Sequence, residues 1–121
     1  MKLVVPETES EEIKRLLARE SSNTWVSSVL LTVESRRNVR RNGPQYTMRL
    51  EALLETVTQL AIDETVIKSA SLLPGDTLRS LDAIHLATAL LLREELDTFV
   101  TYDKHLAAAA ERQGLRVSAP A

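Results

Sequence analysis

The fold is decided by the most helical and most apolar stretch of the chain, which carries one acid near its head. It reads Leu81-Asp82-Ala83-Ile84-His85-Leu86-Ala87-Thr88-Ala89-Leu90-Leu91. Its apolar residues recur at helical spacing and leave little room for a polar face, so we expect a helix that is buried on most sides. Asp82 then has two open explanations. It complements the helix dipole behind an N-cap at Ser80, or it points into a site.

Short apolar strands alternate with helices along the rest of the chain. We predict strands over residues 24–27, 59–62, 98–102 and 115–118, and helices over residues 9–20, 29–41, 48–58, 64–72, 81–94 and 104–112. This alternation favours an α/β domain with a short, mostly parallel sheet flanked by helices. No repeat or linker divides the chain, so residues 1–121 are expected to form a single domain.

Composition excludes several classes of protein. The chain has no cysteine, which rules out thiolate chemistry and cysteine metal sites, and its longest apolar run, near Leu86 to Leu92, is too short to span a membrane. We therefore expect a soluble, cytoplasmic protein. A net charge of −2 and 3% aromatic residues argue against binding of nucleic acid by bulk attraction. Any such contact must be local, and the one concentrated basic patch is Arg36, Arg37, Arg40 and Arg41.

Three acids stand where a parallel sheet places its sites, beyond the carboxyl ends of the strands. Asp103 follows the strand at 98–102, Asp82 heads the buried helix, and Glu34 lies about two turns into the helix after the Trp25 strand. Each has a structural alternative, because Asp103 can be an N-cap, Asp82 a first-turn acid, and Glu34 a partner of Arg37. Together they would repel one another, which favours a cage for a hard divalent cation.

The other polar and aromatic candidates have structural explanations. We expect His85 to be a hydrogen-bonded core residue and His105 to lie at the surface, so neither is assigned as a general base. Trp25 and Phe99 are expected in the core, and Asp63 is expected to cap the helix at 64–72.

Three segments carry a resemblance to a known family: Leu81–Ala89, Val100–Asp103 before an alanine-rich helix, and Ser27–Glu34. They resemble the motifs of the PIN domain family, in particular the VapC toxins. The resemblance implies a Mg²⁺- or Mn²⁺-dependent endoribonuclease, the toxin of a type II toxin and antitoxin pair. It further implies an RNA substrate, a cognate VapB-like antitoxin as partner, and a homodimer.

By motif match, Glu34, Asp82 and Asp103 would be the metal-binding carboxylates, and Thr101 a polar neighbour that holds water or an acid in place. Arg36, Arg37, Arg40 and Arg41 would contact RNA phosphates or an acidic part of the antitoxin, with a solvated helix face as the alternative.

The chain departs from the family at its start. Members open with a central strand that ends in an aspartate, whereas Lys2–Glu7 resembles a segment that follows that strand and the first helix. The expected fold is therefore a PIN-like three-layer domain whose first central strand and aspartate are missing. An internal start codon, a natural truncation, or another segment or chain that fills the gap would each account for this.

Two other functions remain open at this point. One is a catalytically impaired PIN-like module that binds an antitoxin or RNA without cleaving it, and the other is a helical interaction domain whose acids are only caps.

Overall fold

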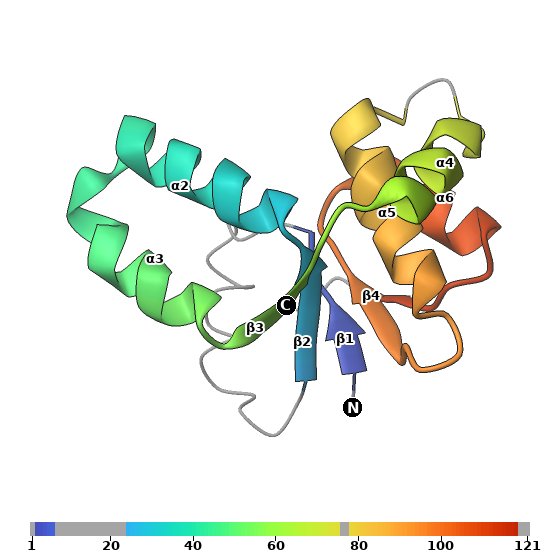
Figure 1. Ribbon diagram of the computed structural model, residues 1–121, viewed down its shortest axis with the longest axis horizontal. Helices are drawn as coiled ribbons and strands as arrows, with labels where there is room; N and C mark the ends of the chain where they lie inside the picture. The colour runs from blue at the N-terminus through green and yellow to red at the C-terminus, as the bar shows by residue number, and fades with distance from the viewer. Residues whose placement is uncertain (1, 7–23, 76–77, 119–121) are drawn as a thin grey trace.

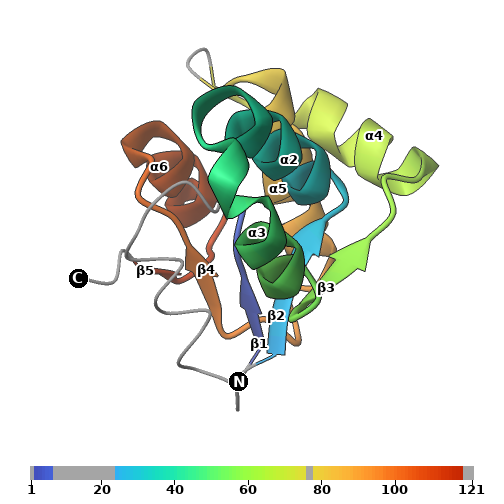
Figure 2. The same ribbon diagram turned by 90° about the vertical axis from the view of Figure 1, so that its left-hand side faces the viewer.

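A parallel sheet with helices on both faces forms the centre of the molecule (Figures 1 and 2). This computed structural model describes residues 2–6, 24–75 and 78–118, so the helix predicted over residues 9–20 lies outside the described residues. In chain order the elements are β1 (Lys2–Val4), β2 (Thr24–Ser28), α2 (Leu30–Asn42), the 3-10 helix η1 (Pro44–Tyr46), α3 (Thr47–Leu54), β3 (Val57–Leu60), α4 (Glu64–Leu72), α5 (Ser80–Leu91), β4 (Thr98–Val100), α6 (Lys104–Arg112) and β5 (Val117–Ser118).

The sheet has five strands in the order β3-β2-β1-β4-β5, and all four pairings are parallel. The middle strand, β1, pairs Leu3 with Trp25 of β2 and Val4 with Phe99 of β4. Parallel strands covered on both faces are apolar on both faces, and Leu3 and Val4 are accordingly both buried. The α/β class and the parallel, helix-flanked sheet predicted from the sequence are confirmed.

The centre of the sheet differs from the expectation in one respect. The first central strand was expected to be missing, and this detail is wrong, because Lys2–Val4 occupies the central position. The physical reason is that an empty centre would leave the facing edges of β2 and β4 unpaired, and a short apolar segment satisfies both. The two residues after β1 are Val5 and Pro6, both buried, so apolar residues follow the central strand where the family pattern has an aspartate.

Strand residues alternate between two cores. On one face Leu3, Trp25 and Val57 pack with Leu31 and Val39 of α2 and with Leu50 and Leu54 of α3. On the other face Val4, Val26 and Phe99 pack with Leu86 and Ala89 of α5 and with Leu106, Ala109 and Ala110 of α6. Figure 1 shows this division, with α2 and α3 on one side of the sheet and α4, α5 and α6 on the other. Trp25 and Phe99 are core residues, as expected.

One helix ends earlier than its apolar spacing predicted. The helix predicted to run to residue 58 ends at Leu54, and the next strand begins at Val57, because Val57 is buried opposite Trp25 in the sheet. The helix α5 is buried along its middle, while Leu81 and Leu91 at its ends are about half exposed. No helix among residues 2–6, 24–75 and 78–118 is both long and apolar enough to cross a membrane.

Candidate functional site

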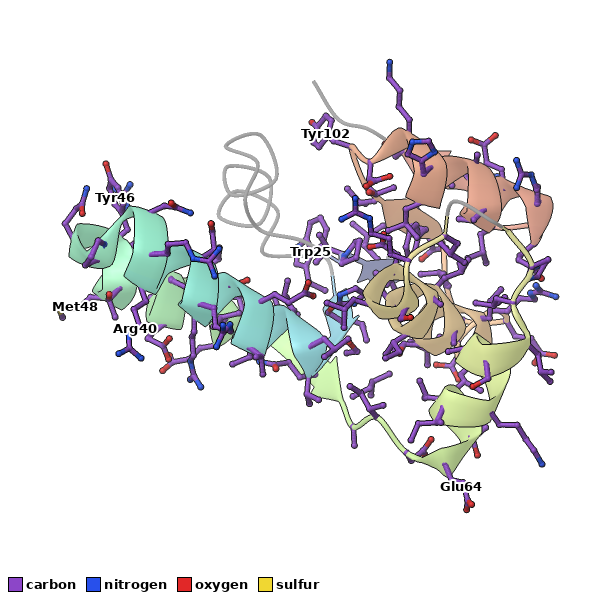
Figure 3. All side chains as sticks on the ribbon, turned by 90° about the horizontal axis from the view of Figure 1, so that it is seen from above. Trp25, Arg40, Tyr46, Met48, Glu64 and Tyr102 are labelled. Carbon is purple, nitrogen blue, oxygen red and sulfur yellow. The ribbon has the colours of Figure 1, made fainter. Side chains whose placement is uncertain are left out.

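The three acids singled out from the sequence approach one edge of the sheet. The strands point upward in Figure 1, and Figure 3 looks down on the edge where they end. The helix α2, which carries Glu34, begins just after β2 ends, and Asp103 follows β4 and begins α6. Asp82 lies in the first turn of α5, which packs on the same sheet. The topology thus gathers residues that are up to 69 positions apart in the chain, from Glu34 to Asp103.

Asp82 lies in surroundings that disfavour its charged form. Burial raises its pKa, and the carboxylates of Asp103 and Glu34 raise it further, while His85 and Arg79 act in the opposite direction. Each of the other two acids is therefore close enough to repel the charge on Asp82. Its N-terminal surroundings also differ from the expectation, because the N-cap of α5 is Arg79, not Ser80, and no side chain caps the helix.

Asp103 is both an N-cap and a member of this acidic group. Its Oδ1 accepts a hydrogen bond from the backbone N–H of Leu106 at 2.9 Å. Its own backbone N–H donates to Oγ1 of Thr101 at 3.0 Å, and Thr101 is buried. The hydroxyl oxygen of Thr101 thus holds the backbone from which Asp103 projects, and a role of Thr101 in an active site stays a prediction.

Glu34 is paired, but not with Arg37. Its Oε1 lies 2.7 Å from Nε2 of His85, and the Glu34 side chain is one-third exposed while His85 is buried. The reason is position on α2: Glu34 shares the inner side of the helix with Leu31, which is fully buried, whereas Arg37 is exposed. The sequence-based alternative of a Glu34–Arg37 pair is not formed.

His85 joins Glu34 to the end of β2. Its Nδ1 lies 3.2 Å from Oγ of Ser28, and that oxygen accepts the backbone N–H of Leu30 at 3.3 Å. A carboxylate only accepts hydrogen bonds, so Nε2 must carry the hydrogen donated to Glu34. Ser28 can then donate its hydroxyl hydrogen to Nδ1, and every hydrogen bond from Leu30 to Glu34 has a donor and an acceptor.

This chain of hydrogen bonds includes a residue that sequence reasoning missed. His85 was correctly expected to be a hydrogen-bonded core residue, and His105 is exposed as expected. Ser28 was not singled out. Two signals were present: Ser28 ends a strand, and His85 follows Asp82 by three residues and so shares its helix face.

The four arginines do not behave alike. Arg36 donates two hydrogen bonds to Glu51 of α3, at 2.7 and 3.0 Å, and so ties α2 to α3. Arg37, Arg40 and Arg41 are exposed and form no ion pair with another described residue. Arg40 lies toward the end of α2 that is farther from the sheet, as Figure 3 shows. Of the four arginines in the predicted basic patch, Arg36 is thus paired within the protein, and the other three are exposed without an ion pair to a described residue.

The donor chemistry at this edge suits a hard divalent cation. Carboxylate oxygens are the ligands that such ions prefer, and the mutual repulsion around Asp82 is the arrangement that a cation relieves. With the side chains in these positions, however, the described part of the chain holds no group of three or more His, Cys, Asp or Glu residues that could hold a metal ion. The fit therefore rests on the kind of ligand and on the charge of the edge.

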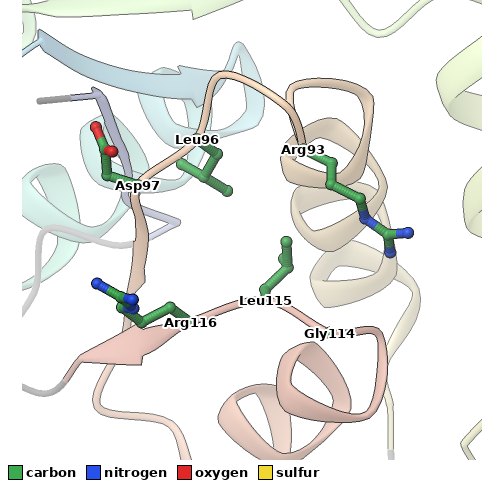
Figure 4. A pocket seen from close by; sticks show the side chains of 6 residues that line it. All are labelled: Arg93, Leu96, Asp97, Gly114, Leu115 and Arg116. Atoms are coloured by element: carbon green, nitrogen blue, oxygen red, sulfur yellow. The ribbon is translucent and has the colours of Figure 1, made fainter.

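A pocket of about 280 Å³ lies at the other end of β4 (Figure 4). It is lined by Arg93, Leu96, Asp97, Gly114, Leu115 and Arg116. Asp97 directly precedes β4, whereas Thr101 and Asp103 follow it, so the pocket and the three acids lie at opposite ends of this strand. The pocket is not part of the acidic site.

Comparison with known proteins places the chain in a family. The PIN domain model matches residues 1–112. The chain is 36% identical to Ribonuclease VapC35 of Mycobacterium tuberculosis, in an alignment that covers 99% of this chain and 90% of that protein. It is 38% identical to Ribonuclease VapC47 of the same species, over 98% of this chain and 90% of that one.

Among solved structures, the chain resembles FitAcB from Neisseria gonorrhoeae, with a TM-score of 0.67 over 99% of this chain and 98% of that chain. The identity is 19%, so this likeness bears on the fold alone. The family model and the relatives agree with the three motifs that first suggested the resemblance. The chain belongs to the PIN domain family.

Proposed function

We propose that this chain is a divalent-cation-dependent endoribonuclease, the toxin of a toxin and antitoxin pair. The observation that carries the proposal is the charge at the sheet edge, where Asp103 and Glu34 both raise the pKa of a half-buried Asp82. A structural role for each acid does not explain why the charges of Asp103 and Glu34 both lie close enough to Asp82 to disfavour its ionisation. The names of the curated relatives, Ribonuclease VapC35 and Ribonuclease VapC47, support the same activity.

In this proposal Glu34, Asp82 and Asp103 hold Mg²⁺ or Mn²⁺. When bound, the ion supplies Lewis-acid activation of a water and of a phosphate oxygen. The protein supplies the negative edge that attracts the ion, and Thr101 fixes the backbone of Asp103 through its hydroxyl. Burial and the neighbouring carboxylates disfavour the charged form of Asp82, and a bound cation would favour it.

The remaining parts of the proposal concern partners and assembly. Arg37, Arg40 and Arg41 are exposed cations that suit RNA phosphates or an acidic segment of the antitoxin. A cognate antitoxin, a homodimer, a cytoplasmic location and a single domain over residues 1–121 stay predictions that follow from the family resemblance and the sequence.

The test is cleavage of a labelled RNA of mixed sequence by Asp82→Asn and Asp103→Asn in Mg²⁺ and in EDTA. We expect the wild type to cleave only with the cation, and both variants to lose cleavage while staying folded. The matched control is Asp63→Asn, since Asp63 caps α4 as Asp103 caps α6, with a bond from Val66 at 3.0 Å, but belongs to no acidic group described above. Cleavage that survives both substitutions would show that the catalytic assignment is wrong.

A second candidate function is favoured by the residues after β1. Val5 and Pro6 are buried and apolar at the carboxyl end of the central strand, where the family pattern has an aspartate. Among the described residues, this end of the central strand supplies no carboxylate, which suits a catalytically impaired module that binds an antitoxin or RNA. Calorimetric titration with Mn²⁺ separates the two functions, because only the nuclease predicts binding that Asp82→Asn suppresses.

A further inference from the structure

His85 and Ser28 form a polar connection inside an apolar core, and the proposed chemistry does not use either of them. Ser28 is 1% exposed and His85 is 3% exposed. Thr88 and Ala89, which share the helix face of His85 in the following turn of α5, are both buried. Burying an imidazole among such residues costs free energy unless both ring nitrogens are satisfied, so this connection needs its partners at both ends.

The partners link three elements that are far apart in sequence. Ser28 ends β2, His85 lies on α5, and Glu34 lies on α2. The helices α2 and α5 lie on opposite sides of the sheet in Figure 1. The hydrogen bond from His85 to Glu34 joins these two helices, and the one between His85 and Ser28 joins α5 to the carboxyl end of β2. The orientation of Glu34 is therefore set by α5, the helix that also carries Asp82.

Glu34 needs such support because it is partly exposed. A glutamate side chain has three rotatable bonds, and one that is one-third exposed would sample several rotamers without a partner. The buried His85 cannot move without disturbing the core, so its Nε2 holds Oε1 of Glu34 at one position. Carboxylates that bind metals are commonly oriented by hydrogen bonds of this kind.

We propose that His85 and Ser28 are positioning residues that orient the Glu34 carboxylate toward the edge where Asp82 and Asp103 lie, so that the three acids act on one cation. The inference rests on the proposed function. It assigns His85 a role through Glu34, without contact of its own with the ion or the RNA.

The test compares His85→Gln with His85→Leu in the full chain. Glutamine keeps an N–H donor for Glu34, whereas leucine keeps the bulk and removes both hydrogen bonds. Mn²⁺ affinity is measured by calorimetry, and folding of each variant is checked by circular dichroism and thermal unfolding. We expect His85→Leu to weaken Mn²⁺ binding by about 10- to 100-fold, as loss of an orienting partner does, and His85→Gln to recover most of the affinity.

The chain offers matched controls for both residues. His105 is exposed, so His105→Leu should leave Mn²⁺ affinity unchanged. Ser27 is equally buried on the same strand but faces the other side of the sheet, so Ser27→Ala should also leave it unchanged, whereas Ser28→Ala should weaken it. Ser28→Ala is the smaller change and keeps the test open if His85→Leu does not fold.

A second measurement does not depend on the metal. In the metal-free wild type the Nε2 hydrogen of His85 should give a slowly exchanging NMR signal, and Glu34→Ala should abolish it.

The outcomes separate this inference from the proposed function. Wild-type Mn²⁺ binding that is absent or unaffected by Asp82→Asn would overturn the proposed function and this inference with it. Binding that depends on Asp82 but is equally tight in wild type and His85→Leu would overturn only the positioning role. A loss in His85→Gln as large as that in His85→Leu would do the same, since the N–H donor would then not matter.

Discussion

Asp103 and Asp63 both cap helices, but only Asp103 also repels the charge on Asp82. Substituting each of them therefore separates the free energy of the cap from that of the charge repulsion. Each caps a nine-residue helix, α6 or α4, and each accepts the backbone N–H three residues on, at 2.9 and 3.0 Å. Both residues are exposed. Loss of such a cap costs ~0.5–2 kcal/mol of stability. Asp63→Ala should show this cost in full.

Asp103→Ala should cost less than Asp63→Ala. It loses the same kind of cap, but it also removes the repulsion between Asp103 and Asp82. Charge pairs at partly exposed positions interact by ~0.2–1 kcal/mol, and we expect the difference between the two variants to be of this size. In an Asp82→Asn background the repulsion is already gone, so the two substitutions should then cost the same.

The assay is urea unfolding of the two single variants in EDTA, repeated in the Asp82→Asn background. Saturating Mg²⁺ adds a second reading, because a ligand at 100 times its Kd stabilises the folded state by ~2.7 kcal/mol. Wild type and Asp63→Ala should both show such a gain, and Asp103→Ala should lose most of it. If Asp103→Ala costs as much as Asp63→Ala in both backgrounds, and the gain from Mg²⁺ is equal in both, then Asp103 is only a cap and the charge argument fails.

Two further predictions concern the stability of the metal-free protein. Burial and the neighbouring carboxylates raise the pKa of Asp82, so stability falls as pH rises from the unfolded-state pKa of this carboxyl group to its higher folded-state pKa. Asp82→Asn should therefore be more stable than wild type at pH 7, by a margin that shrinks on acidification. Urea unfolding across a pH series that shows no such margin would contradict this. Leu86 is fully buried in the core with Val26 and Phe99, so Leu86→Ala should cost ~2–5 kcal/mol, while Leu91→Ala at a half-exposed position should cost far less. Equal shifts in thermal unfolding would contradict the packing described for α5.

Local pattern was enough to predict most of the elements and the class of fold. The helix at 104–112 was predicted with its observed ends, and so was the helix at 64–72 with its cap at Asp63. Their signals are short-range, because a capping side chain, an apolar stripe and a stop residue lie within a few positions of one another. The end of α3 was misplaced because Val57 belongs to a strand through its pairing with Trp25, and pairing partners are not visible in a local window.

The residues of the candidate site could be predicted from the sequence, but the contacts between them could not. The residues Glu34, Asp82, Asp103 and Thr101 were identified from motifs, and the topology explains why they gather, since parallel strands end at one edge. Their roles as metal ligands remain predictions. The pairing of Glu34 with His85 could not be predicted, because those residues are 51 positions apart and their contact depends on where α2 and α5 lie relative to the sheet.

The sequence by itself determined that this chain folds as an α/β domain with three acids in three motifs, because periodicity, caps and motif spacing are local properties of the chain. Only the tertiary structure decided that Lys2–Val4 fills the centre of the sheet, that Arg36 is engaged by Glu51, and that Ser28 and His85 hold Glu34. Each of these depends on which backbone edges and polar groups remain unsatisfied once the elements pack. That is a property of the whole fold, and no single segment contains it.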